Sequence, residues 1–247
     1  MSMPTHAMVL AAGLGLRMRP LTLTRPKPLI EVAGRTMLDR ALDRLEEAGV
    51  GTAVVNSHHL GHMIGEHLAG RQRPRIVLSP EAELLETAGG VVHALDKLGN
   101  EPFFTVNADI MWLDGPTPAL TRMARCWDPE RMDALLLLMP TVAAVGYEGR
   151  GDYHMEPDGA ARFRQADEIA PFVYAGVQII KPELYRGLTP GKRSNTELWH
   201  KAEAAGRLHG IRHDGVWFHV GTPEALEEVE GLIGRRAPLS QPQTVEP

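Results

Sequence analysis

The hydrophobic positions of this chain alternate between short continuous runs and runs spaced three or four residues apart. Continuous runs are typical of strands buried on both faces of a sheet, and they occur at Ala7–Ala12, Thr52–Asn56, Arg75–Ser79, Phe103–Asn107 and Asp133–Met139. Helical spacing lies between them, with helices expected around Leu38–Leu45, His62–Leu68 and Gly89–Leu98. This alternation predicts a mostly parallel sheet with helices on both sides.

The alternation breaks after about residue 150. Tyr153–Met155 and Arg162–Arg164 flank Pro157-Asp158-Gly159, which predicts a hairpin. Beyond the hairpin we expect a strand at Phe172–Ile180 and a helix at Asn195–Ala205. A pair of strands should follow, Leu208–Arg212 with Val216–Val220, and then a last helix at Thr222–Leu232. The predicted fold class is α/β, a doubly wound, mostly parallel, Rossmann-like sheet with a small antiparallel insert. We expect one domain over residues 1–232 and a disordered tail over 233–247.

Composition and charge exclude several classes of function. The 247 residues carry a formal net charge of −5, which argues against a general nucleic-acid-binding surface. Cys126 is the only cysteine, so an intrachain disulfide and a cysteine-based zinc cluster are both excluded. The sequence has no signal-peptide pattern and no apolar run near the ~20 residues of a membrane span. We expect a cytoplasmic monomer or homodimer whose partners are small molecules, not nucleic acid or membranes.

The segment from Leu10 to Pro28 reads L-A-A-G-L-G-L-R-M-R-P-L-T-L-T-R-P-K-P. Its two glycines, Gly13 and Gly15, allow backbone N–H groups to approach an anion without an intervening Cβ. Arg17 follows them, and Lys27 lies between two prolines that stiffen its loop. Together these features predict a polyphosphate cradle, although the spacing is neither that of a P-loop nor G-x-G-x-x-G. The alternative is a tight turn with solvated basic side chains.

Asp109 comes directly after the apolar run Phe103–Asn107. Ligands of open α/β sheets bind beyond the carboxyl ends of the strands, which is where this carboxylate should lie. A carboxylate there can hold Mg²⁺, which bridges phosphate oxygens and offsets their charge. The alternative is an aspartate that caps a loop.

The pattern L-A-A-G-x-G-x-R-x-x-P-x-T-x-x-x-P-K-P resembles the signature of the sugar-1-phosphate nucleotidylyltransferases, which have a GT-A-like fold. N-A-D at Asn107–Asp109 and E-T-A-G-G at Glu86–Gly90 resemble two further motifs of that family. Over about residues 6–232 the resemblance narrows to the N-acetylmuramate-1-phosphate uridylyltransferases of cell-wall peptidoglycan recycling. The segments that carry it are Gly149–Asp152, Tyr174–Val177 and Trp217–Thr222.

The resemblance implies a role for individual residues. The residues that would bind the nucleotide are Ala11, Gly13, Gly15, Leu16, Arg17, Lys27, Glu86 and Gly89, the last two at the nucleobase. Those that would bind the sugar phosphate are Asn107, Asp152, Glu168 and Gly176. The catalytic residues would be Arg17, Lys27 and Asp109. Mg²⁺, with Mn²⁺ as the alternative, would be bound by Asp109 and His219.

His219 departs from the family pattern, because the family usually has a second metal-binding aspartate at this position. Neutral imidazole is a poor ligand for Mg²⁺. His219 could contact the metal weakly, bind phosphate, favour Mn²⁺ or Co²⁺, or simply pack against Trp217. A second departure is that an E-K-P lysine motif found in some relatives is missing near Gln165–Ile169.

The implied reaction transfers a uridylyl group from UTP to a sugar 1-phosphate, in the closest case N-acetylmuramate 1-phosphate, and releases pyrophosphate. Three alternatives stay open on sequence alone. The chain could be a guanylyl or thymidylyl transferase for a mannose, heptose or rhamnose precursor, a choline-phosphate cytidylyltransferase, or a nucleotide-binding homologue without catalytic activity.

Overall fold

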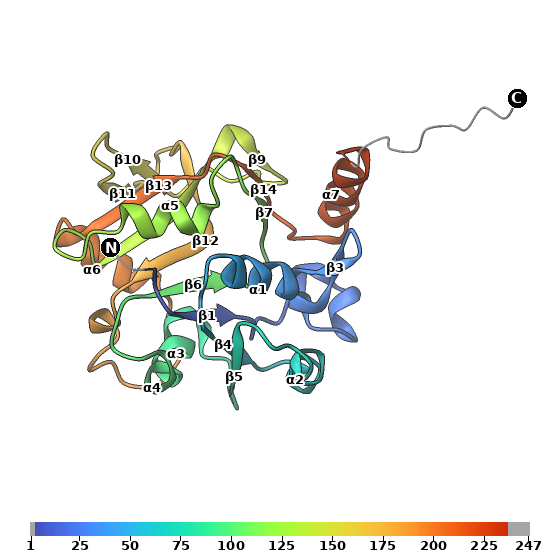
Figure 1. Ribbon diagram of the computed structural model, residues 1–247. Helices are drawn as coiled ribbons and strands as arrows, with labels where there is room; N and C mark the ends of the chain where they lie inside the picture. The colour runs from blue at the N-terminus through green and yellow to red at the C-terminus, as the bar shows by residue number, and fades with distance from the viewer. Residues whose placement is uncertain (1–2, 237–247) are drawn as a thin grey trace, which may run out of the picture.

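The computed structural model describes residues 3–236, and a nine-stranded sheet forms its centre (Figure 1). One continuous path through the sheet runs β11-β10-β12-β6-β1-β4-β5, and β8 lies beside β12 with β13 at its outer edge. The strands are β1 (His6–Leu10), β4 (Thr52–Ser57), β5 (Arg75–Pro80), β6 (Phe103–Asn107), β8 (Ala134–Pro140), β10 (Tyr153–Met155), β11 (Ala161–Phe163), β12 (Phe172–Ile180) and β13 (Leu208–Arg212). The pairs β5–β4, β4–β1, β1–β6 and β8–β13 are parallel, whereas β12 runs antiparallel to both β6 and β8. The predicted α/β fold with a mostly parallel sheet is confirmed.

Helices cover both faces of this sheet (Figure 1). One face packs against α1 (Met37–Glu47), α2 (Gly61–Leu68) and α5 (Ala119–Cys126). The other face packs against α3 (Glu86–His93), α4 (Leu95–Leu98) and α6 (Thr196–Ala204). Within β1, Ala7 and Val9 belong to the first cluster and Met8 to the second. Apolar side chains are needed on both sides of such a strand, which explains its continuous apolar sequence.

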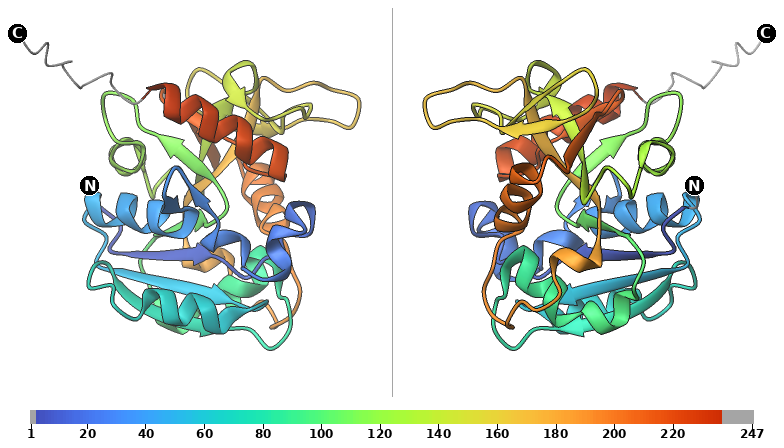
Figure 2. Two further views of the ribbon diagram at one scale, coloured as in Figure 1. Left: turned by 90° about the vertical axis from the view of Figure 1, so that its right-hand side faces the viewer. Right: turned by 90° about the vertical axis from the view of Figure 1, so that its left-hand side faces the viewer.

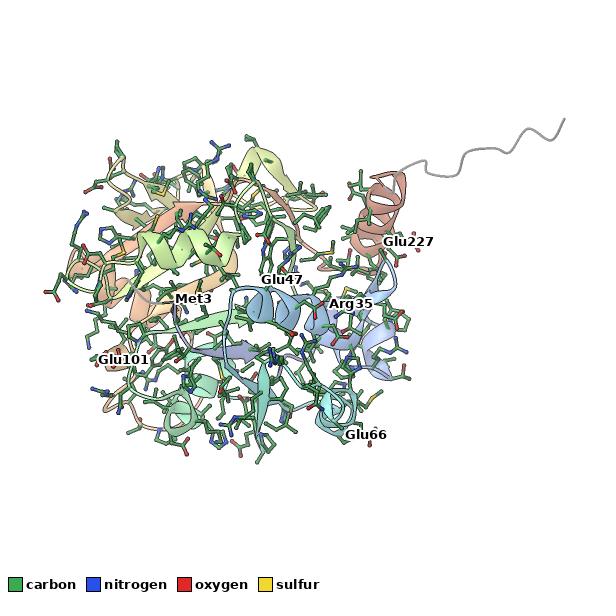
Figure 3. All side chains as sticks on the ribbon, in the orientation of Figure 1. Met3, Arg35, Glu47, Glu66, Glu101 and Glu227 are labelled. Atoms are coloured by element: carbon green, nitrogen blue, oxygen red, sulfur yellow. The ribbon has the colours of Figure 1, made fainter. Side chains whose placement is uncertain are left out.

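A smaller three-stranded sheet and the last helix lie outside these layers (Figure 2). The small sheet contains β7 (Met111–Leu113), β14 (Val216–Phe218) and β9 (Ala144–Val145). The last helix, α7 (Pro223–Arg236), packs near the hairpin of β2 (Glu31–Val32) and β3 (Arg35–Thr36). Figure 3 shows Arg35 on this hairpin and Glu227 on α7 at the same end of the molecule. A third hydrophobic cluster, which contains Met18, Phe218 and Val229, joins these parts.

The structure corrects one predicted strand pairing. The sequence predicts that Leu208–Arg212 pairs with Val216–Val220, but β13 pairs in parallel with β8, and β14 pairs with β7 and β9 in the other sheet. The reason is that β8 is buried along its length and its free edge requires a partner for its backbone groups. The turn at 213–215 therefore carries the chain from one sheet to the other.

Other element boundaries differ by a few residues. The helix expected at Gly89–Leu98 begins earlier, at Glu86, and divides at Ala94 into α3 and α4. The last helix continues to Arg236, four residues past the predicted boundary between domain and tail. The rest of the predicted tail lies outside the described residues. In residues 3–236 no helix is long and apolar enough to cross a membrane.

Candidate active site

Three parallel strands, β1, β4 and β6, end at the same edge of the sheet and open into one cavity. Leu10 of β1 aligns with Asn107 of β6, while Val9 aligns with Val55 of β4. The cavity has a volume of about 680 Å³, enough for a drug-sized or nucleotide-sized ligand. Its lining includes most of the residues that the sequence assigned to the nucleotide, namely Ala11, Gly13, Gly15, Leu16, Arg17, Lys27 and Glu86, and also Asn107 and Asp109.

The loop after β1 turns sharply at Gly15, which has φ 60° and ψ 34° in the left-handed region. A Cβ at Gly15 would lie 2.8 Å from Thr22 Cγ2 and 3.0 Å from Lys27 Cβ, so this position requires glycine for both conformation and space. Thr22 Oγ1 donates a hydrogen bond of 2.9 Å to the Gly15 carbonyl oxygen and fixes the turn. A single 3-10 turn, Leu16–Met18, follows with Met18 buried in the core. Arg17 is thereby held at the cavity.

Lys27 and Asp109 form an ion pair at the floor of this cavity. Lys27 Nζ lies 2.8 Å from Asp109 Oδ2. The lysine side chain is 8% exposed and the aspartate side chain 42% exposed, so the carboxylate is the more accessible partner, although both residues line the cavity. Because an ammonium carries three protons, Lys27 can donate to Asp109 and to a phosphate at the same time.

His219 follows β14 and brings the C-terminal part of the chain to the same charged cluster. A Cβ at Gly221 would lie 2.7 Å from His219 Nε2 and 3.5 Å from Arg17 Nη1, so both side chains face the backbone of Gly221, which lines the cavity. Burial, and then the positive charges of Lys27 and Arg17, lower the pKa of the His219 imidazole. The ring is therefore mostly neutral at pH 7.

The start of α3 forms the opposite wall. Glu86 lines the cavity with a positive φ of 61°, and its Oε1 lies 3.4 Å from Lys192 Nζ. The N–H groups of Ala88 and Gly89 donate to the Arg193 carbonyl oxygen at 2.9 and 3.1 Å. A Cβ at Gly89 would lie 2.2 Å from the Gly191 carbonyl oxygen. Gly89 thus packs against the 191–193 segment and is not among the residues that line the cavity.

Two residues assigned to the sugar phosphate lie near the insert and are bonded to neighbouring protein groups. Asp152 Oδ2 accepts the Tyr174 N–H at 3.0 Å. Glu168 accepts from Arg162 at 2.9 Å and from the Gln165 N–H at 2.7 Å, and these bonds lower the pKa of the Glu168 carboxyl to about 2. Neither residue lines the cavity described above.

Gly176, the remaining assignment to the sugar, lies at the irregularity of β12 where the register against β8 shifts. Its φ is +81°, and a Cβ there would lie 2.7 Å from Ile110 Cδ1 and 3.3 Å from Asn107 Cβ. A side chain at 176 would therefore push against the strand end that holds Asn107.

The cavity is also lined by residues that were not predicted from the sequence, among them Asn56 and Ser194. Asn56 lies near the carboxyl end of β4, so the rule that ligands bind beyond strand ends could have identified it. Ser194 lies just before α6, more than 80 residues away from the other lining residues of the first half, and no pattern in the sequence marks it.

Oxygen ligands for a metal ion are few at this site. In residues 3–236 no three His, Cys, Asp or Glu side chains are grouped so that they could hold a metal ion by themselves. Mg²⁺ in proteins is commonly bound by one or two carboxylates together with phosphate oxygens and water. The half-exposed carboxylate of Asp109 fits that mode of binding, and neutral His219 fits Mn²⁺ or Co²⁺ better than Mg²⁺.

Comparisons with known proteins agree with this geometry. The family model for the MobA-like NTP transferase domain matches residues 7–174. The chain is 48% identical to N-acetylmuramate alpha-1-phosphate uridylyltransferase of Caulobacter vibrioides, over 93% of this chain and 97% of that protein. It is 37% identical to the protein of the same name from Neisseria meningitidis serogroup B, over 92% and 98% of the two chains.

The fold also matches solved structures. A putative glucose-1-phosphate thymidylyltransferase from Bacillus anthracis superimposes with a TM-score of 0.76 at 16% identity, over 92% of this chain and 94% of that one. At that identity the likeness supports the fold alone. The two sequence relatives and the domain match together confirm the family predicted from Leu10–Pro28. The chain belongs to the MobA-like NTP transferase family and, within it, to the sugar-1-phosphate nucleotidyltransferases.

Proposed function

We propose that this protein transfers a uridylyl group from UTP to N-acetylmuramate 1-phosphate, with UDP-N-acetylmuramate and pyrophosphate as products. The observation that carries the proposal is the 48% identity, over nearly the whole of both chains, to an enzyme named for this reaction. The cavity supports it, because Arg17, Lys27 and Asp109 line a site large enough for a nucleotide. Transfer of this kind belongs to the recycling of cell-wall sugars in the cytoplasm.

The reaction needs positioning and charge neutralisation more than it needs a base. The 1-phosphate oxygen of the sugar is already anionic, so it attacks the α-phosphorus of UTP without losing a proton. A new P–O bond forms in line with the bond to pyrophosphate, which breaks. Lys27 neutralises charge where the two phosphates meet, and Arg17 with the backbone at Gly13 and Gly15 holds the triphosphate.

Asp109 would hold the divalent ion, Mg²⁺ or Mn²⁺, with His219 as the second contact from the protein. When bound, such an ion supplies further neutralisation of the phosphate charge. The ion pair with Lys27 orients the Asp109 carboxylate before the substrate arrives. Asn107, two residues before Asp109, would contact the sugar phosphate. Asp152 and Glu168 near the insert, and Gly176 on β12, would complete the sugar site.

The test is turnover by the purified protein with UTP and N-acetylmuramate 1-phosphate, followed by pyrophosphate release and mass spectrometry of the nucleotide sugar. CTP, GTP and dTTP replace UTP in parallel reactions, and N-acetylglucosamine 1-phosphate and mannose 1-phosphate replace the acceptor. We expect the highest kcat/KM for the UTP and N-acetylmuramate 1-phosphate pair. A preference for GTP or dTTP with another sugar, or nucleotide binding without turnover on any pair, would overturn the proposal.

A further inference from the structure

Two buried polar side chains, Asn56 and Glu81, connect the two walls of the cavity. Ala11 N–H donates to Asn56 Oδ1 at 2.7 Å, and Asn56 Nδ2 donates to Glu81 Oε1 at 2.7 Å. Leu85 N–H donates to Glu81 Oε2 at 3.1 Å. Asn56 is 2% exposed and Glu81 is 6% exposed. An unbroken series of three hydrogen bonds, here called the Asn56–Glu81 bridge, therefore runs from the end of β1 to the start of α3.

The direction of these hydrogen bonds explains the residue types. Glu81 accepts with both oxygens, one from Asn56 and one from Leu85. A glutamine at 81 would place its NH₂ group, itself a donor, against either the Asn56 NH₂ group or the Leu85 N–H. Rotating the Asn56 amide to compensate would place that NH₂ group against the Ala11 N–H. A carboxylate at 81 satisfies every group when position 56 is asparagine, because it only accepts.

Gly90 of the E-T-A-G-G segment makes room for the bridge. A Cβ at Gly90 would lie 2.7 Å from Asn56 Nδ2 and 2.7 Å from Glu81 Oε1, closer than a carbon can approach either atom. The second glycine of the segment is thus required by the protein's own polar side chains. The backbone of Gly90 therefore packs directly against the side chains of Asn56 and Glu81.

The lining residues on the two walls that the bridge joins include no cation. Ala11 lines one wall, and Leu84, Glu86 and Thr87 line the other. The cations Arg17 and Lys27 line the cavity together with Asp109, which pairs with Lys27. If UTP binds as proposed, with its triphosphate at Arg17 and Lys27, its nucleoside would lie between the two bridged walls.

We propose that Asn56 and Glu81 set the separation of these walls, and thereby the affinity and base selectivity of the nucleoside site. Glu81 does not line the cavity, so it acts through Ala11 and Leu85 as a positioning residue. The inference rests on the proposed uridylyltransferase function, which identifies the nucleoside as uridine. The energetic basis is that a buried polar group left without its partner is costly, so the walls move to avoid it.

The decisive experiment compares Glu81→Gln with the double variant Asn56→Asp/Glu81→Gln. The single variant brings two donors together at one end of the bridge. The double variant reverses the bridge, since the new carboxylate at position 56 accepts from the Ala11 N–H and from the new amide at position 81. The amide oxygen at position 81 still accepts from the Leu85 N–H. Glu83→Gln is the matched control, because Glu83 lies two residues away and is exposed.

For Glu81→Gln we expect the KM for UTP to rise about tenfold or more, with a fall in the UTP-over-CTP selectivity ratio. kcat and the KM for the sugar 1-phosphate should stay near wild type. The double variant should recover the wild-type KM for UTP and the selectivity, and Glu83→Gln should match wild type throughout. If Glu81→Gln does not fold in a thermal melt, Gly90→Ala replaces it, since its methyl group displaces the bridge without removing an atom from it.

Two failures can be told apart. Wild-type protein that neither binds UTP in calorimetry nor turns it over contradicts the proposed function. Active wild-type protein contradicts the bridge if Glu81→Gln, or Gly90→Ala in its place, keeps the wild-type KM for UTP. The bridge is also contradicted if the double variant fails to recover, or if kcat and both KM values change together.

Discussion

Lys27 Nζ lies 2.8 Å from Asp109 Oδ2, although 82 residues separate the two along the chain. The lysine comes from a 3-10 turn between prolines, and the aspartate follows β6. The buried cation and the half-exposed carboxylate hold each other in place, so both are oriented before any phosphate arrives. The pair also makes the two side chains interdependent.

Replacing Lys27 with alanine should lower kcat/KM by about 10²–10³-fold, because a fixed positive charge at the reacting phosphates is lost. The measurement is pyrophosphate release at saturating metal, with circular dichroism to confirm folding. Arg25→Ala is the control, because it removes an exposed cation two residues away. Wild-type activity in Lys27→Ala would refute the assigned role.

Replacing His219 with aspartate should shift metal preference toward Mg²⁺, because a second carboxylate oxygen replaces an imidazole nitrogen. We expect the ratio of activity with Mg²⁺ to activity with Mn²⁺ to rise at least about threefold. Calorimetric titration of each ion into the UTP complex provides a readout apart from turnover.

In the same titration, Asp109→Asn serves as the reference for loss of a metal ligand. An unchanged ion preference in His219→Asp, together with weaker binding of pyrophosphate in metal-free buffer, would show that His219 contacts phosphate instead.

The sequence was sufficient to predict the features that depend on local pattern. Buried strands such as Phe103–Asn107 and Phe172–Ile180 agree with the structure at both ends, because apolar runs and their flanking turns are local signals. The partner of β13 could not be predicted in this way, since the choice between β8 and β14 depends on which sheet edge is left open.

In the candidate site, too, residues marked by a local pattern could be predicted from the sequence, and residues brought together only by tertiary contacts could not. A long motif and a strand end marked Arg17, Lys27 and Asp109 in the sequence, and the structure places all three at one cavity, while their roles stay predictions. The Asn56–Glu81 bridge was not predicted. Its four residues come from separate parts of the chain, so no local sequence pattern brings them together. Gly89 was assigned to the nucleobase from its motif, while the structure places it against Gly191, a contact that no local pattern encodes.

Replacing Gly15 with alanine should reduce both stability and activity. The new Cβ would lie 2.8 Å from Thr22 Cγ2 in a backbone conformation that L-residues rarely adopt, which costs on the order of 1–3 kcal/mol. Thermal unfolding and the KM for UTP are the two measurements. Gly70→Ala is the stability control, because nothing lies within 4 Å of its Cβ position. Equal melting temperatures for the two variants would contradict this account of the turn.

Glu168 should make the stability of the protein depend on pH in the acid range. The hydrogen bonds from Arg162 and from Gln165 N–H lower the pKa of its carboxyl from 4.5 to about 2. When folding lowers the pKa of a carboxyl, its ionised form stabilises the folded protein at pH values above the pKa of the unfolded chain. For Glu168 this contribution is lost as the pH falls from about 4.5 to about 2.

The Glu168→Gln variant lacks this titration, so its free energy of unfolding should fall less than that of wild type between pH 5 and pH 2.5. Urea unfolding at several pH values in this window measures the difference. Glu148→Gln is the control, because it removes a glutamate that lies just before the G-R-G-D segment and whose side chain forms no ion pair described in the structure. Parallel pH profiles for wild type and Glu168→Gln would mean that the Arg162–Glu168 pair is no stronger in the folded protein than in the unfolded chain.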